Sequence, residues 1–134
     1  MKSSSGPKQQ IFSHLAEIAA ALAHPHRIEI LELIAQGERS VEDLAERIGL
    51  SLSNTSRHLQ VLRRARLAAP RREGKNMFYS LVSETEVVTL LASLGRVGER
   101  NIAEIDQVLQ AYFRARDSLE PVSRLALLEP VSYT

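Results

Sequence analysis

The chain has 134 residues, a length that suits one globular domain and is too short for two. Of these residues 25% are charged and 44% hydrophobic, as is usual in globular proteins. No apolar run is long enough to cross a membrane. The absence of cysteine excludes disulfides, thiolate metal ligands, cysteine nucleophiles and thiol redox switches. The net charge of +1 does not by itself indicate a nucleic-acid partner, and we expect a cytoplasmic protein without a membrane partner.

Two helices are predicted at the start of the chain, after residues 1–8, which we expect to be disordered. The apolar residues of the first helix follow the spacing of one helical stripe: Ile11, Leu15, Ile18 and Leu22. This helix is expected to stop before Pro25, because the residue before a proline avoids the helical region. Pro25 suits the first turn of the second helix, and Gly37 is a typical stop signal after it.

A helix-turn-helix pattern follows. Ser40 is expected to cap a short third helix that Gly49 closes, and Ser51 to cap a fourth helix that runs to about Arg64. Two short helices joined by a tight glycine-containing turn are typical of this motif. On the fourth helix, the residues predicted to face the core are Leu52, Thr55, Leu59 and Leu62.

A β-hairpin and a long last helix complete the predicted domain. Two short extended runs, 67–71 and 77–82, flank a polar segment containing Gly74, which indicates a hairpin. A single helix is expected from near Ser83, with an apolar stripe at Val87, Leu91, Leu94, Ile102, Ile105, Leu109 and Tyr112. We therefore predict a mainly α winged helix-turn-helix of order α-α-α-α-β-β-α over residues 9–116, and a tail or linker over 117–134.

The fourth helix has a polar face opposite its predicted core face. This face carries Ser53, Arg57, Gln60 and Arg64, and it has no acidic residue. Arginine can bind guanine edges in the major groove through two hydrogen bonds, and glutamine can do the same for adenine. Ser53 and Asn54, in the first turn, are suited to phosphate or base edges. The face predicts a helix that reads double-stranded DNA.

The charge distribution supports this interpretation. Residues 57–75 hold one acidic residue, Glu73, and seven basic residues: Arg57, Arg63, Arg64, Arg66, Arg71, Arg72 and Lys75. Their net charge is +6, so the rest of the chain carries −5. Positive potential concentrated over one helix and its hairpin is typical of a nucleic-acid-binding surface, although basic helix faces are also common as plain solvated surface.

The segments LAHPHRIEILELI, SVEDLAERIGLSLSNTSRHLQVLRRARL and RREGKNMFYSL resemble the ArsR/SmtB family of winged-helix repressors, over about residues 11–116. The resemblance implies a homodimer that binds an imperfect inverted repeat. It places Ser53, Asn54, Ser56, Arg57 and His58 at the DNA, with Arg72, Gly74 and Lys75 at the wing tip. Leu52 departs from the polar residue common in the family, which puts a base contact there in doubt.

The same resemblance implies dimerisation through the first and last helices, in agreement with their apolar stripes. The predicted interface residues are Ile11, Leu15, Ile18, Leu91, Leu94, Ile102, Ile105 and Leu109. A small-molecule inducer is a further candidate partner, in a pocket between these helices lined by Phe12, Leu15 and Leu94. The tail resembles the linker that precedes a rhodanese-like domain in some members, so the chain is either a single-domain form or a fragment.

Metal-dependent sensing is not expected, because the chain lacks thiols and its last helix has carboxylates but no histidine. His24 and His26 are interpreted as a helix cap and hydrogen-bonding group in preference to metal ligands. For His58, phosphate contact and packing are both open. No nucleophile has a base at a recognisable spacing, so we expect neither enzyme activity nor a cofactor.

The sequence therefore predicts a sequence-specific DNA-binding transcriptional regulator, most simply a repressor. The alternative is a winged helix used for dimerisation or protein contact without specific DNA binding, a role that does not need a basic stripe.

Overall fold

The computed structural model describes residues 6–101 and 105–116, so the predicted tail (117–134) and most of the predicted N-terminal segment lie outside the described residues. In chain order the elements are α1 (Pro7–Leu22), α2 (Pro25–Ala35), β1 (Arg39–Ser40), α3 (Val41–Ile48), α4 (Leu52–Arg64), β2 (Ala68–Glu73), β3 (Asn76–Leu81), α5 (Glu84–Asn101) and α6 (Ile105–Arg116). The mainly α fold with a small antiparallel hairpin is confirmed.

The structure differs from the prediction in three details. α1 begins at Pro7, so residues 7 and 8 belong to a helix and not to a disordered start. The expected single last helix is described as two helices, α5 and α6. The two-residue strand β1 was not predicted; it pairs with β3, with Arg39 opposite Tyr79, and makes a three-stranded sheet of order β1-β3-β2.

The predicted capping residues position the helices of the motif. The Ser40 hydroxyl accepts a hydrogen bond from the Asp43 N–H (3.0 Å), and the Ser51 hydroxyl accepts one from the Asn54 N–H (3.1 Å). Between them Gly49 has a φ of 82°, a left-handed conformation that glycine adopts without strain. These caps satisfy N–H groups that the helices leave unpaired, so the turn between α3 and α4 is defined by local chemistry.

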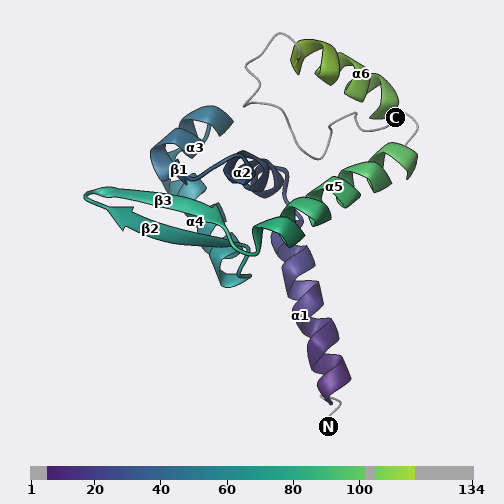
Figure 1. Cartoon of the computed structure of the whole chain (residues 1–134), viewed down its shortest axis with the longest axis horizontal. Coiled ribbons are helices and arrows are strands. Elements are labelled where there is room, and N and C mark those ends of the chain that lie inside the picture. Colours follow the sequence, from purple (N-terminus) through teal and green to yellow (C-terminus); the bar gives the residue numbers. More distant parts are fainter. Residues whose placement is uncertain (1–5, 102–104, 117–134) are drawn as a thin grey trace.

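Helix α2 lies at the centre of the domain (Figure 1), where α1, α3, α4, α5 and β3 pack against it. Ile30 and Leu31 are fully buried there. They belong to a core cluster that also contains Ala21, Leu33, Ile34, Val41, Leu44, Leu59, Leu62, Leu67, Ala68, Tyr79, Val87 and Leu91. Close packing around α2 fixes the orientation of α4 against it, and this orientation determines which face of α4 is exposed to solvent.

The predicted core face of α4 is confirmed at Thr55, Leu59 and Leu62, each with no exposed surface. It is wrong at Leu52, which is 52% exposed.

The hairpin and α1 project from the domain in different directions (Figure 1). In the hairpin, Gly74 has a φ of 63°, as required at the first central position of a tight two-residue turn between Glu73 and Asn76. Among the described residues no helix combines the length and apolarity that spanning a membrane needs.

Candidate nucleic-acid interface

The polar face predicted on α4 is open to solvent. Ser53, Arg57, Gln60 and Arg64 are all exposed, as are Asn54 and Ser56. The Arg57 guanidinium donates a hydrogen bond to the side-chain oxygen of Asn54 (3.0 Å), one turn earlier on the helix. This contact holds the long arginine side chain along the first turn, the part of a recognition helix that meets base edges.

The hairpin adds two cations at its tip. Arg72 and Lys75 are exposed. In a winged helix, cations at such a tip can contact phosphates beside the groove that the recognition helix occupies, and so set the orientation of the helix.

Arg71, counted in the basic run from the sequence, is neutralised. Its guanidinium makes two hydrogen bonds to the Glu38 carboxylate (3.0 and 2.7 Å) and an ion pair with Glu73 (3.0 Å), and it lies over the Phe78 ring. The hydrogen bond to Glu38 raises the pKa of Arg71, and the same contact lowers the pKa of the Glu38 carboxyl. Arg71 therefore stabilises the base of the hairpin and contributes little net charge toward a ligand.

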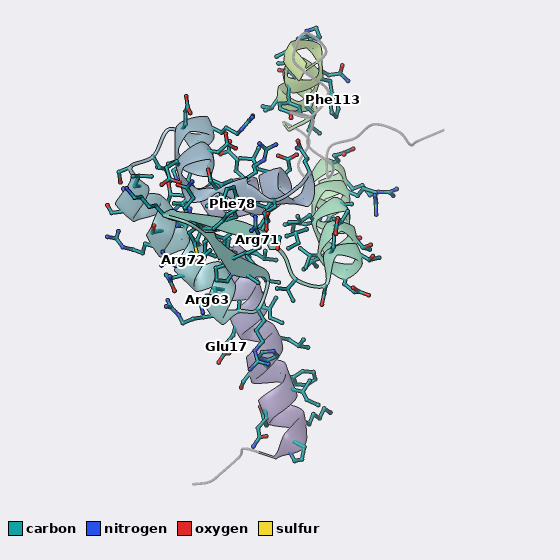
Figure 2. All side chains as sticks on the ribbon, turned by 60° about the vertical axis from the view of Figure 1, so that its left-hand side comes forward. Glu17, Arg63, Arg71, Arg72, Phe78 and Phe113 are labelled. Carbon is teal, nitrogen blue, oxygen red and sulfur yellow. The ribbon has the colours of Figure 1, made fainter. Side chains whose placement is uncertain are left out.

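The remaining basic residues of the run keep their charge available. They are exposed, and none forms an ion pair with an acidic side chain in the part of the chain that the structure describes: Arg57, Arg63, Arg64, Arg66, Arg72 and Lys75. Figure 2 shows Arg63 and Arg72 on the same side of the molecule, with Arg71 beside Phe78. The basic surface thus spans α4 and the hairpin, as the charge distribution predicted.

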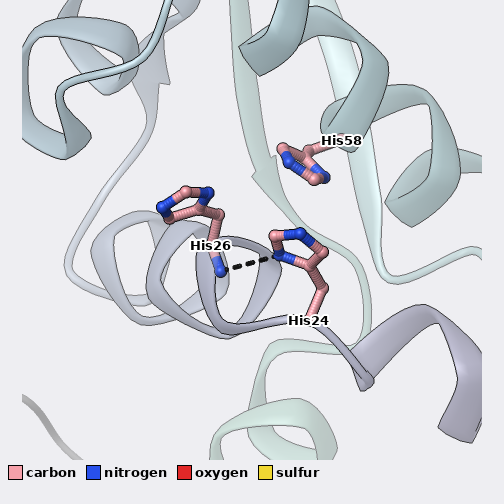
Figure 3. Close-up of side chains that lie close together, drawn as sticks. All are labelled: His24, His26 and His58. Carbon is pink, nitrogen blue, oxygen red and sulfur yellow. Dashed lines mark hydrogen bonds between the residues drawn. The ribbon is translucent and has the colours of Figure 1, made fainter.

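His58 points into a cluster of side chains and not toward the polar face. Its ring lies close to the rings of His24 and His26 (Figure 3), with ring centres 4.4 Å and 5.8 Å away. The Arg27 guanidinium approaches the Nδ1 atom of His58 to 3.2 Å. Burial first, and then the nearby positive charges of His24, Arg27, His26 and Arg57, lower the pKa of His58. Of the two roles left open by the sequence, the structure favours packing.

The three histidines offer nitrogen atoms within 4.8 Å of one another, but their hydrogen bonds compete with metal binding. The His24 Nδ1 atom accepts a hydrogen bond from the His26 N–H (3.1 Å), so the neutral ring carries its proton on Nε2. The guanidinium of Arg27 covers Nδ1 of His58 and brings a positive charge to the place where a cation would sit. The cluster instead ties the start of α2 to α4.

Arg27 is a positioning residue that sequence reasoning missed. Besides its contact with His58, it donates hydrogen bonds to the carbonyl oxygens of Ala21 (2.7 Å) and Ala20 (3.3 Å), at the end of α1. One side chain therefore joins α1, α2 and α4. The signal was present in the motif His24-Pro25-His26-Arg27, in which roles were predicted for the histidines and the proline but not for Arg27.

The chain is similar to known proteins in sequence and in structure. A model of the bacterial regulatory protein arsR family matches residues 24–69, which cover α2 to the start of β2. The HTH-type transcriptional regulator Rv0081 of Mycobacterium tuberculosis is 41% identical over 103 residues, 76% of this chain and 90% of that protein. Its crystal structure aligns with a TM-score of 0.64. The chain belongs to the ArsR family.

Two further relatives extend this comparison. The regulator Rv0324 of M. tuberculosis is 35% identical over 105 residues, but the chain spans only 46% of its length. The solution structure of a fragment of Mb0332 from Mycobacterium bovis, described as a homodimeric winged helix-turn-helix DNA-binding domain, aligns with a TM-score of 0.67 at 35% identity over 76% of this chain and 94% of that one. The ArsR-family chain is thus a transcriptional regulator with a winged helix-turn-helix DNA-binding fold.

A second surface of this ArsR-family chain is apolar. Exposed apolar side chains gather on three helices: Ile11, Phe12 and Leu15 on α1, Leu90, Leu94 and Val97 on α5, and Val108 on α6. Of the predicted interface residues, Ile11, Leu15 and Leu94 are exposed and Ile18 is half-buried. Leu91 (2% exposed) and Leu109 (6%) are buried within one subunit, which does not support the prediction that they lie at the dimer interface. Ile102 and the side chain of Ile105 lie outside the described residues.

A hollow of about 250 Å³ lies beside the apolar surface, between α1, the end of α4 and α5. Ile18, Val87 and Leu90 are among its lining residues, whereas Phe12, Leu15 and Leu94, expected to line an inducer pocket, do not contribute. This hollow lies within one subunit and does not test a pocket at the dimer interface, so an inducer and its lining stay predictions.

Proposed function

We propose that this ArsR-family chain is a sequence-specific repressor that binds an imperfect inverted repeat as a homodimer in the cytoplasm. In this proposal α4 of each subunit enters the major groove, and the hairpin tip contacts the flanking phosphates. One observation carries the proposal: the exposed face of α4 with Arg57, Gln60 and Arg64 continues into exposed cations at the hairpin. A winged helix used only for protein contact does not need that surface.

Dimerisation is supported by the apolar side chains of α1 and α5 that a single subunit leaves exposed, and by the homodimeric state described for the M. bovis relative. Large exposed apolar patches on soluble proteins are typical of interaction sites. A two-fold dimer places its two recognition helices in half-sites about 34–36 Å apart, one turn of DNA.

The test is selection of duplexes from a random pool with the full chain, followed by footprinting on the enriched sequence. We expect an inverted repeat with half-sites one helical turn apart. If each subunit neutralises about four phosphates, the logarithm of the affinity falls with a slope of about −7 against the logarithm of the salt concentration. An intact dimer that enriches no sequence, and binds no duplex at low salt, would support the protein-contact alternative.

A further inference from the structure

Leu52 is an exposed leucine that the proposed dimer does not explain. It is the first residue of α4 and is 52% exposed. The other large hydrophobic side chains found exposed in the described residues lie on α1, α5 and α6. α1 approaches α4 near Val61, Arg64 and Ala65, which lie about 14 to 20 Å along the helix from Leu52, at 1.5 Å a residue.

The core is complete without Leu52. Thr55, Leu59 and Leu62 fill the buried face of α4 with no exposed surface. At about 100° a residue, Leu52 lies some 20° from buried Leu59 and 40° from exposed Ser56, so it continues the core side of α4 and is exposed because it lies one turn beyond the buried part. Leu52 is therefore an exposed apolar group on the first turn of α4, the turn that the proposed complex inserts most deeply.

The major groove offers one prominent apolar group to such a side chain. Guanine, cytosine and adenine present hydrogen-bond donors and acceptors there, whereas thymine adds the C5 methyl group. A leucine that meets donors and acceptors alone would leave them without partners, and a leucine that meets a methyl group removes apolar surface of both from water.

We propose that Leu52 recognises the C5 methyl of a thymine in each half-site of the operator. This inference rests on the proposed function and adds a specificity-determining residue to it. It also gives a meaning to the departure from the family pattern at this position: the contact expected of a polar side chain becomes an apolar one, and the preferred base changes accordingly.

The experiment removes the methyl group without changing base pairing. In the duplex enriched from the random pool, each thymine is replaced in turn, in both half-sites, by deoxyuridine. Binding of the full chain and of Leu52→Ala is measured by fluorescence anisotropy. We expect one thymine position at which the replacement weakens the unsubstituted protein about fourfold for each half-site, as for one buried methyl group. The same replacement should not change the affinity of Leu52→Ala for the duplex.

Two controls sharpen the result. Gln60→Ala should lose affinity but keep the discrimination between thymine and deoxyuridine at that position, since its contact lies elsewhere. Circular dichroism should show that Leu52→Ala folds, because the side chain removed is half exposed.

The outcomes separate the two proposals. If no duplex is enriched, the proposed function fails and the inference fails with it. If a duplex is enriched but no thymine position discriminates, or Leu52→Ala keeps the discrimination, the inference alone is overturned.

Discussion

The molecule has two exposed surfaces of opposite chemistry. The surface of α4 and the hairpin is polar and basic, and apart from Arg71 its arginines form no ion pair with the acidic side chains that the structure describes. The surface of α1 and α5 is apolar, with Ile11, Leu15 and Leu94 open to solvent. A folded monomer gains little from either, because charges concentrated on one face repel and exposed apolar groups order water. Each surface is therefore best explained by a partner, DNA for the first and a second subunit for the second.

The largest effect should come from charging the apolar surface. Leu15→Glu combined with Leu94→Glu places carboxylates at two side chains that are 53% and 43% exposed in one subunit, so the subunit core is spared. We expect sedimentation to show a monomer, and affinity for the inverted repeat to fall by about 10²-fold or more, since one subunit holds one half-site. Ser13→Glu, an exposed position on the opposite side of α1, is the control and should remain a dimer. A dimer with unchanged affinity after the double substitution would contradict the division of roles.

The next test stays within the basic surface and compares three arginines. Arg57→Ala removes a candidate DNA contact and should weaken binding by more than about 1 kcal/mol. Arg64→Ala is expected to behave alike, whereas Arg71→Ala removes the same charge from a side chain already paired with Glu38 and Glu73. We expect Arg71→Ala to leave the salt slope of binding unchanged, and a phosphate contact at Arg57 or Arg64 to reduce it by about one. Equal slopes in all three variants would show that the ion pairs of Arg71 do not set it apart.

A smaller effect is expected at the junction between α4 and the hairpin. Arg66 ends the helix with a φ of 63°, while the N–H of Leu67 donates to the carbonyl oxygen of Leu62 (2.9 Å). Glycine adopts this conformation without the strain that a side chain brings. Arg66→Gly should therefore be more stable to urea than Arg66→Ala by about 1 kcal/mol, although both lose the same charge. An alanine variant at least as stable as the glycine variant would rule out strain at this position.

The elements nearest the DNA-binding surface were predictable because their signals are local. Ser40, Gly49 and Ser51 define the turn between α3 and α4 by hydrogen bonds and backbone conformation within a few residues. The periodicity that placed Thr55 and Leu59 inward is equally local, as is the turn at Gly74. For these reasons the face of α4 and the tip of the hairpin could be named before the fold was known.

The errors have non-local causes. Leu52 repeats the periodicity of the core, but it is 52% exposed because the described elements that bury Thr55 and Leu59 do not cover it, so periodicity alone placed it wrongly. The charge of Arg71 is balanced by the carboxylate of Glu38, which lies 33 residues earlier. His58 packs on His24, from another helix. Leu91 carries the same signal as Leu94, yet Leu91 belongs to the subunit core because α5 crosses α2 there.

The histidine cluster should make the stability of the region around α4 depend on pH. The cluster ties this recognition helix to the core, and the described residues of the apolar surface contain no such cluster. Burial, with the positive charges of His24, Arg27, His26 and Arg57, holds the pKa of His58 below 6.5 in the folded protein. Below pH 6.5 the unfolded chain therefore binds a proton at His58, whereas the folded chain binds it only when the pH falls to the lowered pKa of this side chain. The free energy of unfolding should fall as the pH is lowered through that window, and should be constant in this contribution above it.

His58→Gln removes the titrating group, so its free energy of unfolding, measured in urea between about pH 5 and pH 8, should depend less on pH than that of the unsubstituted protein. Glu29 acts in the opposite sense, because burial raises the pKa of that carboxyl from 4.5, an effect that His26 opposes; both proteins keep this contribution, so it cancels in the comparison. His14→Gln is the matched control, since His14 lies 55% exposed on α1. If His58→Gln keeps the full pH dependence, or His14→Gln loses it, the cluster does not couple proton uptake to the stability of the recognition helix.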